Sequence, residues 1–282
     1  MQTTRQSEGA LPGVDLMKNV SVHAEIVDVT GGKALLLAVP MQALGGLLDA
    51  SPQFGTAQPL VACCKGIDLA TLRGPVALIE WRRPGASFAI LTGPSRLCRR
   101  HRALSAHGAD ACDGVGRHGA ARPAVRPNLR LYRTDEVRGA ELGGALRNVI
   151  AIGAGTVIGA GLGDSARAAL MIRSYAEMVR LAGALGTGAE TLAGLSGLGD
   201  LVLTCNSPQS RNFRFRCSVR LSEGFARLFP SKALPPPARC GGWSGGLWVE
   251  MPVTAMVDAL ASGRITRNDA IDQPMRRPLK QE

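Results

Sequence analysis

The sequence predicts an α/β domain built on a doubly wound parallel sheet, followed by an all-α domain. Short continuous apolar runs closed by glycine or proline recur in the first third of the chain. Such runs are typical of strands that are buried on both faces of a parallel sheet. From about residue 136 onward, apolar residues recur at helical spacing instead. We therefore expect a sheet domain over residues 1–135 and a helical domain over residues 136–282.

The first strand is expected over residues 32–40, "GKALLLAVP". The second strand, "PLVACCKG", covers residues 59–66, and the third, "SFAILTGPS", covers residues 87–95. Residues 41–50, between the first two strands, carry apolar residues at helical spacing, as a crossover between parallel strands requires. "LRLYRT", residues 129–134, is a further strand candidate.

Candidate binding residues lie where these strands end. Lys65 follows the second apolar run, and Gly93 and Ser95 follow the third. In doubly wound sheets, ligands bind at the carboxyl ends of the strands. Lys65 is therefore a candidate cation for a phosphate or a carbonyl oxygen, with a solvated lysine in a turn as the alternative.

The helical domain contains one clear helix, "GDSARAALMIRSYAEMVRLAGALG", over residues 163–186. Asp164 or Ser165 is expected to cap its start, and Gly186 suits its end. A further helix is predicted in the tail, within residues 251–271.

Seven cysteines occur, and none forms a CxxC pair. An odd number of cysteines without an export signal indicates reduced thiols, and the spacing argues against a metal site. The longest uncharged run, residues 148–163, is shorter than the roughly 20 apolar residues of a membrane span. We expect a cytoplasmic protein with no metal and no membrane span.

The net charge of +11 comes mainly from two stretches. Residues 96–126 contain seven Arg and two Asp, and residues 214–249 contain five Arg and one Lys against one Glu. Neither has a helical charge stripe or the interleaved aromatics of RNA-binding proteins, so we expect irregular segments and no nucleic-acid partner. Their Arg, Ala, Gly, Cys and Pro bias is also typical of a GC-rich gene translated out of frame. We hypothesise that both stretches are frameshift products.

A polar cluster, "NSPQSRN" over residues 206–212, follows "GLGDLVLTC" directly. It combines hydroxyl, amide and guanidinium donors, which can coordinate phosphate together with backbone N–H groups. A loop that caps a helix is the alternative, because Ser and Asn are good caps. Helix N-cap is also the alternative role of Asp200, where an apolar run begins after two glycines.

Taken in order, "LLLAVPMQAL", "KGI", "ILTGPS", "ELGGALRNVIAIGAG", "GLGDSARAAL", "GLGDLVLTC" and "SPQSRN" resemble the bacterial-type NAD(P)-dependent glycerol-3-phosphate dehydrogenases. The resemblance covers roughly residues 9–95 and 127–213 and a tail from about 251. It implies a Rossmann-like sheet, a helical substrate domain and NAD or NADP as cofactor. It also implies the reversible reduction of dihydroxyacetone phosphate to sn-glycerol 3-phosphate for phospholipid synthesis. The sequence leaves the oligomeric state open, with a homodimer as one alternative.

The resemblance implies roles for individual residues by their position. Asp200 would lie beside the catalytic amine, and Lys65 and Arg211 would contact both substrate and cofactor. The remaining substrate-binding residues that the resemblance implies are Gly93, Ser95, Ser210 and Asn212.

Arg147 stands where the resemblance implies a lysine that acts as the acid/base. A lysine can release its proton near neutral pH when burial and nearby cations lower its pKa, whereas arginine stays protonated. Charge and hydrogen bonding survive this replacement, but we expect proton transfer to be lost.

The glycine-rich turn that the resemblance implies for the cofactor pyrophosphate does not occur in this sequence. The sequence starts past that unit of the family, so about 50 residues are expected to be absent. The incomplete Rossmann-like sheet predicts an impaired enzyme. A non-catalytic remnant that binds phosphate or a protein partner is the alternative.

Overall fold

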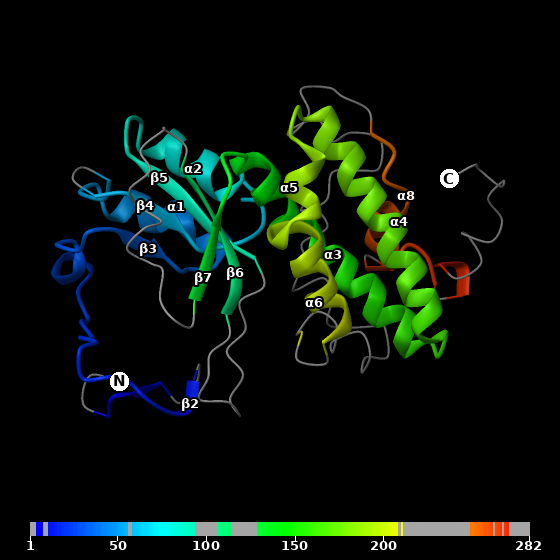
Figure 1. Ribbon diagram of the computed structural model, residues 1–282, viewed down its shortest axis with the longest axis horizontal. Helices are drawn as coiled ribbons and strands as arrows, with labels where there is room; N and C mark the ends of the chain where they lie inside the picture. The colour runs from blue at the N-terminus through cyan, green and yellow to red at the C-terminus, as the bar shows by residue number, and fades with distance from the viewer. Residues whose placement is uncertain are drawn as a thin grey trace.

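The chain folds into a sheet domain and a helical domain, which meet where the long helix α3 (Val137–Gly159) leaves the sheet (Figure 1). The computed structural model describes residues 4–7, 11–55, 58–93, 106–113, 129–207, 210, 249–261, 263–266 and 268–270. The expected class, a Rossmann-like sheet followed by a helical domain, is confirmed.

The sheet domain contains a small two-stranded sheet and a five-stranded sheet in the order β3-β4-β5-β6-β7. The strands are β1 (Gln6–Ser7), β2 (Leu11–Asp15), β3 (Leu35–Leu37), β4 (Leu60–Ala62), β5 (Phe88–Thr92), β6 (Ala106–Asp113) and β7 (Leu129–Arg133). The helices of this domain are η1 (Ile26–Val29), α1 (Met41–Ala50) and α2 (Pro75–Arg82). β3, β4 and β5 are parallel, so their carboxyl ends share one edge of the sheet.

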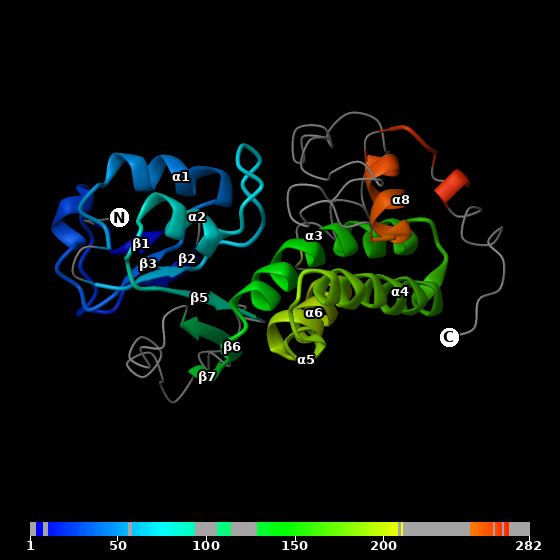
Figure 2. The same ribbon diagram turned by 90° about the horizontal axis from the view of Figure 1, so that it is seen from above.

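The core of this domain lies between the parallel strands and the helices α1 and α2, which lie on one face of the sheet (Figure 2). β4 is buried along its whole length, as its apolar run predicts. α1 buries Met41, Leu44 and Leu48, which are spaced by three and four residues and therefore share one helix face. The three strands of the parallel core lie within the residue ranges that the sequence predicts.

One strand arises where the sequence predicts an irregular segment. β6 lies inside residues 96–126 and pairs antiparallel with β5 and parallel with β7. Its sequence, "AHGADACD", has little strand propensity of its own, so pairing with two neighbouring strands overrides the local preference. For this part of the chain, the expectation of irregular structure is wrong. Residues 214–248 of the second basic stretch lie outside the described residues.

The helical domain is organised around α3. Its further helices are α4 (Gly163–Ala184), α5 (Ala189–Ala193), the π-helix η3 (Leu195–Gly199), α6 (Asp200–Asn206) and α8 (Pro252–Ala261). One buried cluster includes Leu146, Met178 and Leu201 from α3, α4 and α6. A second cluster packs Val257 of α8 against α3.

α3 is long and apolar enough to cross a membrane by length and composition alone, but 67% of its most apolar window is buried inside the protein. Such burial is typical of a core helix. α4 begins at Gly163 with Leu162 at the N-cap, so neither Asp164 nor Ser165 caps it. Asp164 instead forms an ion pair with Arg167 at 3.0 Å. Gly186 follows the helix with a left-handed φ of 72°, as predicted for its end.

Two buried glutamates accept hydrogen bonds from the N-terminal N–H groups of other helices. Glu141 of α3 accepts the backbone N–H of Val76 in α2 at 2.6 Å. Glu177 of α4 accepts the N–H groups of Val253 and Thr254 in α8, together with the Thr254 hydroxyl at 2.9 Å. The first four N–H groups of a helix lack partners within it, and a carboxylate satisfies them with favourable charge. Glu141 thereby fixes α3 to the sheet domain, and Glu177 fixes α8 to the helical domain.

Candidate active site

A glycine pair in α3 brings three parts of the chain together. A Cβ at Gly143 would lie 2.6 Å from the carbonyl oxygen of Ser196 in η3. A Cβ at Gly144 would lie 3.6 Å from the side chain of Lys65 and 3.7 Å from Thr92 Oγ1. The small residues around Arg147 therefore permit close approach to η3 on one side and to the carboxyl edge of the parallel sheet on the other.

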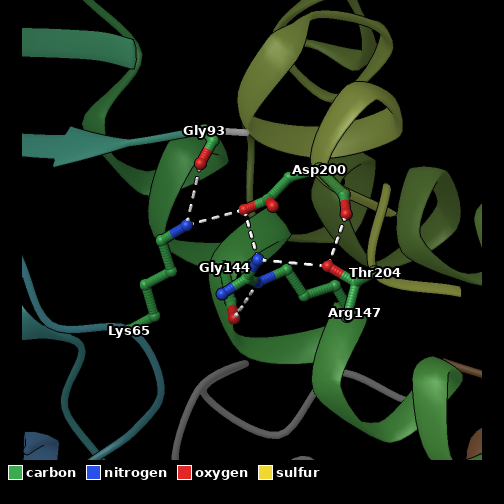
Figure 3. Close-up of polar contacts among 6 residues, drawn as sticks. All are labelled: Lys65, Gly93, Gly144, Arg147, Asp200 and Thr204. Carbon is green, nitrogen blue, oxygen red and sulfur yellow. Dashed lines mark hydrogen bonds and ion pairs between the residues drawn. The ribbon is translucent and has the colours of Figure 1, made fainter. Parts of the chain in front are cut away.

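Lys65 follows β4 and extends over this edge (Figure 3). Its Nζ donates to the carbonyl oxygen of Gly93, which follows β5, at 3.1 Å. The same Nζ lies 2.7 Å from Asp200 Oδ2. Only 18% of the Lys65 side chain is exposed, so the alternative of a solvated turn lysine is wrong.

Asp200 is the first residue of α6, and its side chain is 3% exposed. Its Oδ2 contacts Arg147 Nη1 at 2.5 Å as well as Lys65 Nζ. Gly199 occupies the N-cap position, and Asp200 makes no capping hydrogen bond. The Asp200 carboxylate therefore pairs with Lys65 and Arg147 and does not cap α6.

Arg147 is held by two helices of the helical domain, its own helix α3 and α6 (Figure 3). Its Nη1 donates to Thr204 Oγ1 at 3.3 Å, and its Nε donates to the carbonyl oxygen of Gly144 at 3.4 Å. The Thr204 hydroxyl donates in turn to the backbone carbonyl of Asp200 at 2.6 Å. Thr204 and Asp200 are one helical turn apart, so α6 presents both to the guanidinium.

The electrostatics of the site follow from two cations and one carboxylate. Burial lowers the pKa of Lys65, the positive charge of Arg147 lowers it further, and Asp200 opposes both. Lys65 is thus the cation of the site that can exchange a proton, because arginine remains charged at all physiological pH values.

Thr92 places a buried hydroxyl beside Lys65. It ends β5 directly before Gly93, it is 3% exposed, and its Oγ1 has no hydrogen-bond partner among the described residues. Buried polar groups are normally paired, so a free hydroxyl beside Lys65 indicates a place for a ligand. These residues fit the reactive end of a nicotinamide cofactor together with a small oxygen-rich substrate. No glycine-rich turn for the pyrophosphate occurs in the sequence.

The structure brings four of the predicted site residues together: Lys65, Gly93, Arg147 and Asp200. Ser210 is buried beyond the end of α6. Ser95, Arg211 and Asn212 lie outside the described residues.

The sequence does not identify Thr204 and Thr92 as residues of the site. A spacing of four residues from Asp200 is the signal that could have found Thr204, and the position before Gly93 is the only signal for Thr92. Cys63, Cys64 and Cys205 are free thiols, and no cluster of three potential metal ligands occurs within the described ranges.

Comparison with known proteins gives a consistent family. Residues 1–96 match the family described as the N-terminus of NAD-dependent glycerol-3-phosphate dehydrogenase, and residues 136–226 match the corresponding C-terminus. The chain is 50% identical to a glycerol-3-phosphate dehydrogenase (NAD(P)+) of Cereibacter sphaeroides over 99% of this chain and 92% of the relative. It is 48% identical to that of Paracoccus denitrificans over 96% of this chain and 87% of the relative.

The fold agrees with a solved structure of the same name. The crystal structure of a glycerol-3-phosphate dehydrogenase from Coxiella burnetii superposes with a TM-score of 0.81 at 24% identity, covering 98% of this chain and 87% of that one. The sheet with its helical partner domain and the two matched segments lead to one conclusion: the chain belongs to the NAD(P)-dependent glycerol-3-phosphate dehydrogenase family.

Proposed function

We propose that this chain binds dihydroxyacetone phosphate and sn-glycerol 3-phosphate and carries out their interconversion in an impaired form. The observation that supports this most directly is the convergence of Lys65 and Arg147 on Asp200 at the carboxyl edge of the sheet. Two buried cations suit a carbonyl oxygen that gains negative charge as the ketone is reduced. Bound NAD(P)H supplies the hydride to carbon C2.

Each residue of the site has a distinct task in this proposal. Lys65 and Arg147 polarise the C2 carbonyl, and Asp200 keeps the two cations close together despite their repulsion. Thr204 holds the guanidinium in place. Asp200 also orients Lys65, which the nicotinamide end of the cofactor would contact as well.

The phosphate of the substrate is assigned to the segment after α6. Ser210, Arg211 and Asn212 supply hydroxyl, guanidinium and amide donors, which suit a dianionic phosphate. Gly93 and Ser95 would complete the substrate contacts from the sheet, and Arg211 would also reach the cofactor.

Impairment is expected because Arg147 cannot release a proton. General acid/base catalysis typically contributes about 100-fold to 10,000-fold to a rate, so a deficit of this size is expected relative to a lysine at this position. The choice between NAD and NADP stays open. The fold and the reaction suit a soluble protein of the cytoplasm, and a homodimer is the assembly to test first.

NADPH oxidation with dihydroxyacetone phosphate tests the proposal for the wild-type chain, for Arg147→Lys and for Arg173→Lys. Arg173 is exposed on α4, so its variant controls for an arginine-to-lysine change away from the site. We expect Arg147→Lys to raise kcat by at least about 100-fold and Arg173→Lys to change nothing. Equal rates for all three proteins would contradict the assigned role of Arg147.

A remnant that binds glycerol phosphate without turnover is the second candidate, because the guanidinium of Arg147 opposes proton transfer. Calorimetric titration distinguishes the two candidates. Binding of glycerol 3-phosphate without binding of NADPH would favour the remnant, whereas binding of both favours the enzyme.

A further inference from the structure

The amine of Lys65 and the guanidinium of Arg147 are neighbours around one oxygen atom (Figure 3). Lys65 Nζ lies 2.7 Å from Asp200 Oδ2, and Arg147 Nη1 lies 2.5 Å from the same atom. A substrate oxygen that binds to the guanidinium beside Asp200 is therefore close to the amine as well. Of these two cations, the amine is the one that can release a proton.

The Lys65 ammonium is fixed between the two domains. It donates to the carbonyl oxygen of Gly93, which follows β5 in the sheet domain, at 3.1 Å. It also donates to Asp200, the first residue of α6 in the helical domain. An ammonium group carries three N–H bonds. The third N–H can therefore be donated to a substrate oxygen while the other two hold the amine in place.

The surroundings of Lys65 reduce the cost of losing a proton. Burial lowers the pKa of Lys65, and the positive charge of Arg147 lowers it further, while Asp200 raises it. These two residues, on α3 and α6, are the charged groups that act on Lys65 among the described side chains. A neutral Lys65 leaves Arg147 and Asp200 as one pair of opposite charges, which is a favourable state for a buried site.

We propose that Lys65 Nζ delivers the proton to the C2 oxygen in the turnover that this chain retains, while Arg147 stabilises the negative charge on that oxygen. The inference rests on the proposed function, because the C2 carbonyl is taken to lie on both cations. As C2 accepts the hydride, one N–H bond of Lys65 breaks and one O–H bond forms on the substrate. Lys65 is left as a neutral amine, and it recovers its proton from water through the 18% of its side chain that is exposed.

This route is compatible with an impaired enzyme. Asp200 favours the ammonium form of Lys65 and so opposes the release of the proton. Two of the three N–H groups are also directed at Gly93 and Asp200 and away from the substrate. We therefore expect the retained turnover to be slow and to depend on Lys65.

Lys65→Arg tests this dependence in two backgrounds, the wild-type chain and Arg147→Lys. Arginine keeps the positive charge and the hydrogen-bond donors but does not release a proton. We expect Lys65→Arg to lower kcat for NADPH oxidation with dihydroxyacetone phosphate in both. The loss should be at least about 10-fold larger in the wild-type background, because the lysine introduced at position 147 supplies the proton in the other. A role in packing or binding alone would lower kcat by the same factor in both backgrounds. Lys33→Arg, at an exposed position before β3, is the matched control and should change neither rate.

The pH dependence of kcat in the two reaction directions is an independent readout. Reduction of the ketone requires the ammonium form, so kcat of the wild-type chain should fall as pH rises through the pKa of Lys65, which lies below its ordinary value of 10.5. Oxidation of glycerol 3-phosphate requires the neutral amine, so its kcat should rise over the same range. Lys65→Arg should lose both trends. Glu141 is present in both proteins, so its ionisation does not contribute to this difference.

Three results would overturn the inference alone. The first is the same fold loss from Lys65→Arg in both backgrounds, and the second is turnover in Arg147→Lys with none in the wild-type chain. The third is a wild-type rate of ketone reduction that stays constant or rises with pH, which decides the matter even where Lys65→Arg does not fold. Absence of turnover in the wild-type chain and in Arg147→Lys would overturn the proposed function, and the inference with it.

Discussion

Glu141 makes the stability of the chain depend on pH near neutrality. Its carboxyl is buried and accepts N–H groups from the first turn of α2. Burial raises the pKa of Glu141 from 4.5 to about 7, and the hydrogen bonds from Val76 and Ala77 oppose this shift only in part. The folded chain thus binds a proton at Glu141 over a pH range in which the unfolded chain has released it.

The change of the free energy of unfolding with pH follows from the difference between the pKa values of Glu141 in the folded and the unfolded chain. A carboxyl whose pKa is raised by folding contributes stability below its unfolded pKa, and this stability is lost as pH rises through its folded pKa. The two values are about 2.5 units apart, and each unit corresponds to about 1.4 kcal/mol. Between pH 4 and pH 8, ionisation of Glu141 should therefore lower the free energy of unfolding by about 3 kcal/mol.

Glu141→Gln isolates this contribution, because glutamine still accepts the N–H of Val76 but does not ionise. Urea unfolding of both proteins, followed by circular dichroism from pH 4 to pH 8, gives the difference in their free energies of unfolding. We expect this difference to shift by about 3 kcal/mol in favour of the variant as pH rises. Glu25→Gln, at an exposed position of the sheet domain, should show no such shift. A variant with the same pH dependence as the wild type would refute the reasoning.

Four further substitutions test the packing and the polar contacts of the two domains. Gly143→Ala should lower the free energy of unfolding by about 1–3 kcal/mol, because the new Cβ would lie 2.6 Å from a backbone carbonyl oxygen. Gly46→Ala should raise the free energy of unfolding by about 0.5–1 kcal/mol, because Gly46 lies on α1 with open space around it. Thr92→Val removes a buried hydroxyl that has no partner, so the melting temperature of the ligand-free chain should rise. Glu177→Ala leaves the first N–H groups of α8 without an acceptor and should cost about 3 kcal/mol in urea unfolding; an unchanged midpoint would contradict its role.

The parallel core of the sheet is predictable because its signal is local. β3, β4 and β5 are short apolar runs with a turn residue or a lysine after them. β4 and β5 are buried as such runs require, whereas Leu36 in the middle of β3 is 61% exposed, so the expectation of burial on both faces is wrong for β3. β6 is not predictable in this way, because it consists of small and polar residues and its existence depends on the strands on both sides. The capping residue of α4 is predicted wrongly, because Asp164 pairs with Arg167 and Leu162 occupies the N-cap position.

The charged members of the candidate site are predictable from the sequence, whereas its two threonines and its geometry are not. Lys65 and Asp200 stand out by their place after a strand and before a helix, and Arg147 stands out by its charge within an apolar segment. One oxygen of Asp200 contacts both cations because of the way α3 and α6 pack. No local sequence pattern predicts this packing. The role of Glu141 is hidden in the same way, because its partner lies 65 residues away in the sequence.

The sharing of Asp200 by two cations constrains the order in which such a site can decay during evolution. If Lys65 or Arg147 were replaced by a neutral residue, the remaining cation and Asp200 would form a balanced pair. If Asp200 were replaced first, two like charges would face each other without a counter-ion, at the cost of several kcal/mol that is typical of a broken buried pair. A site in which two cations share one carboxylate is therefore expected to keep this aspartate for longer than it keeps its activity.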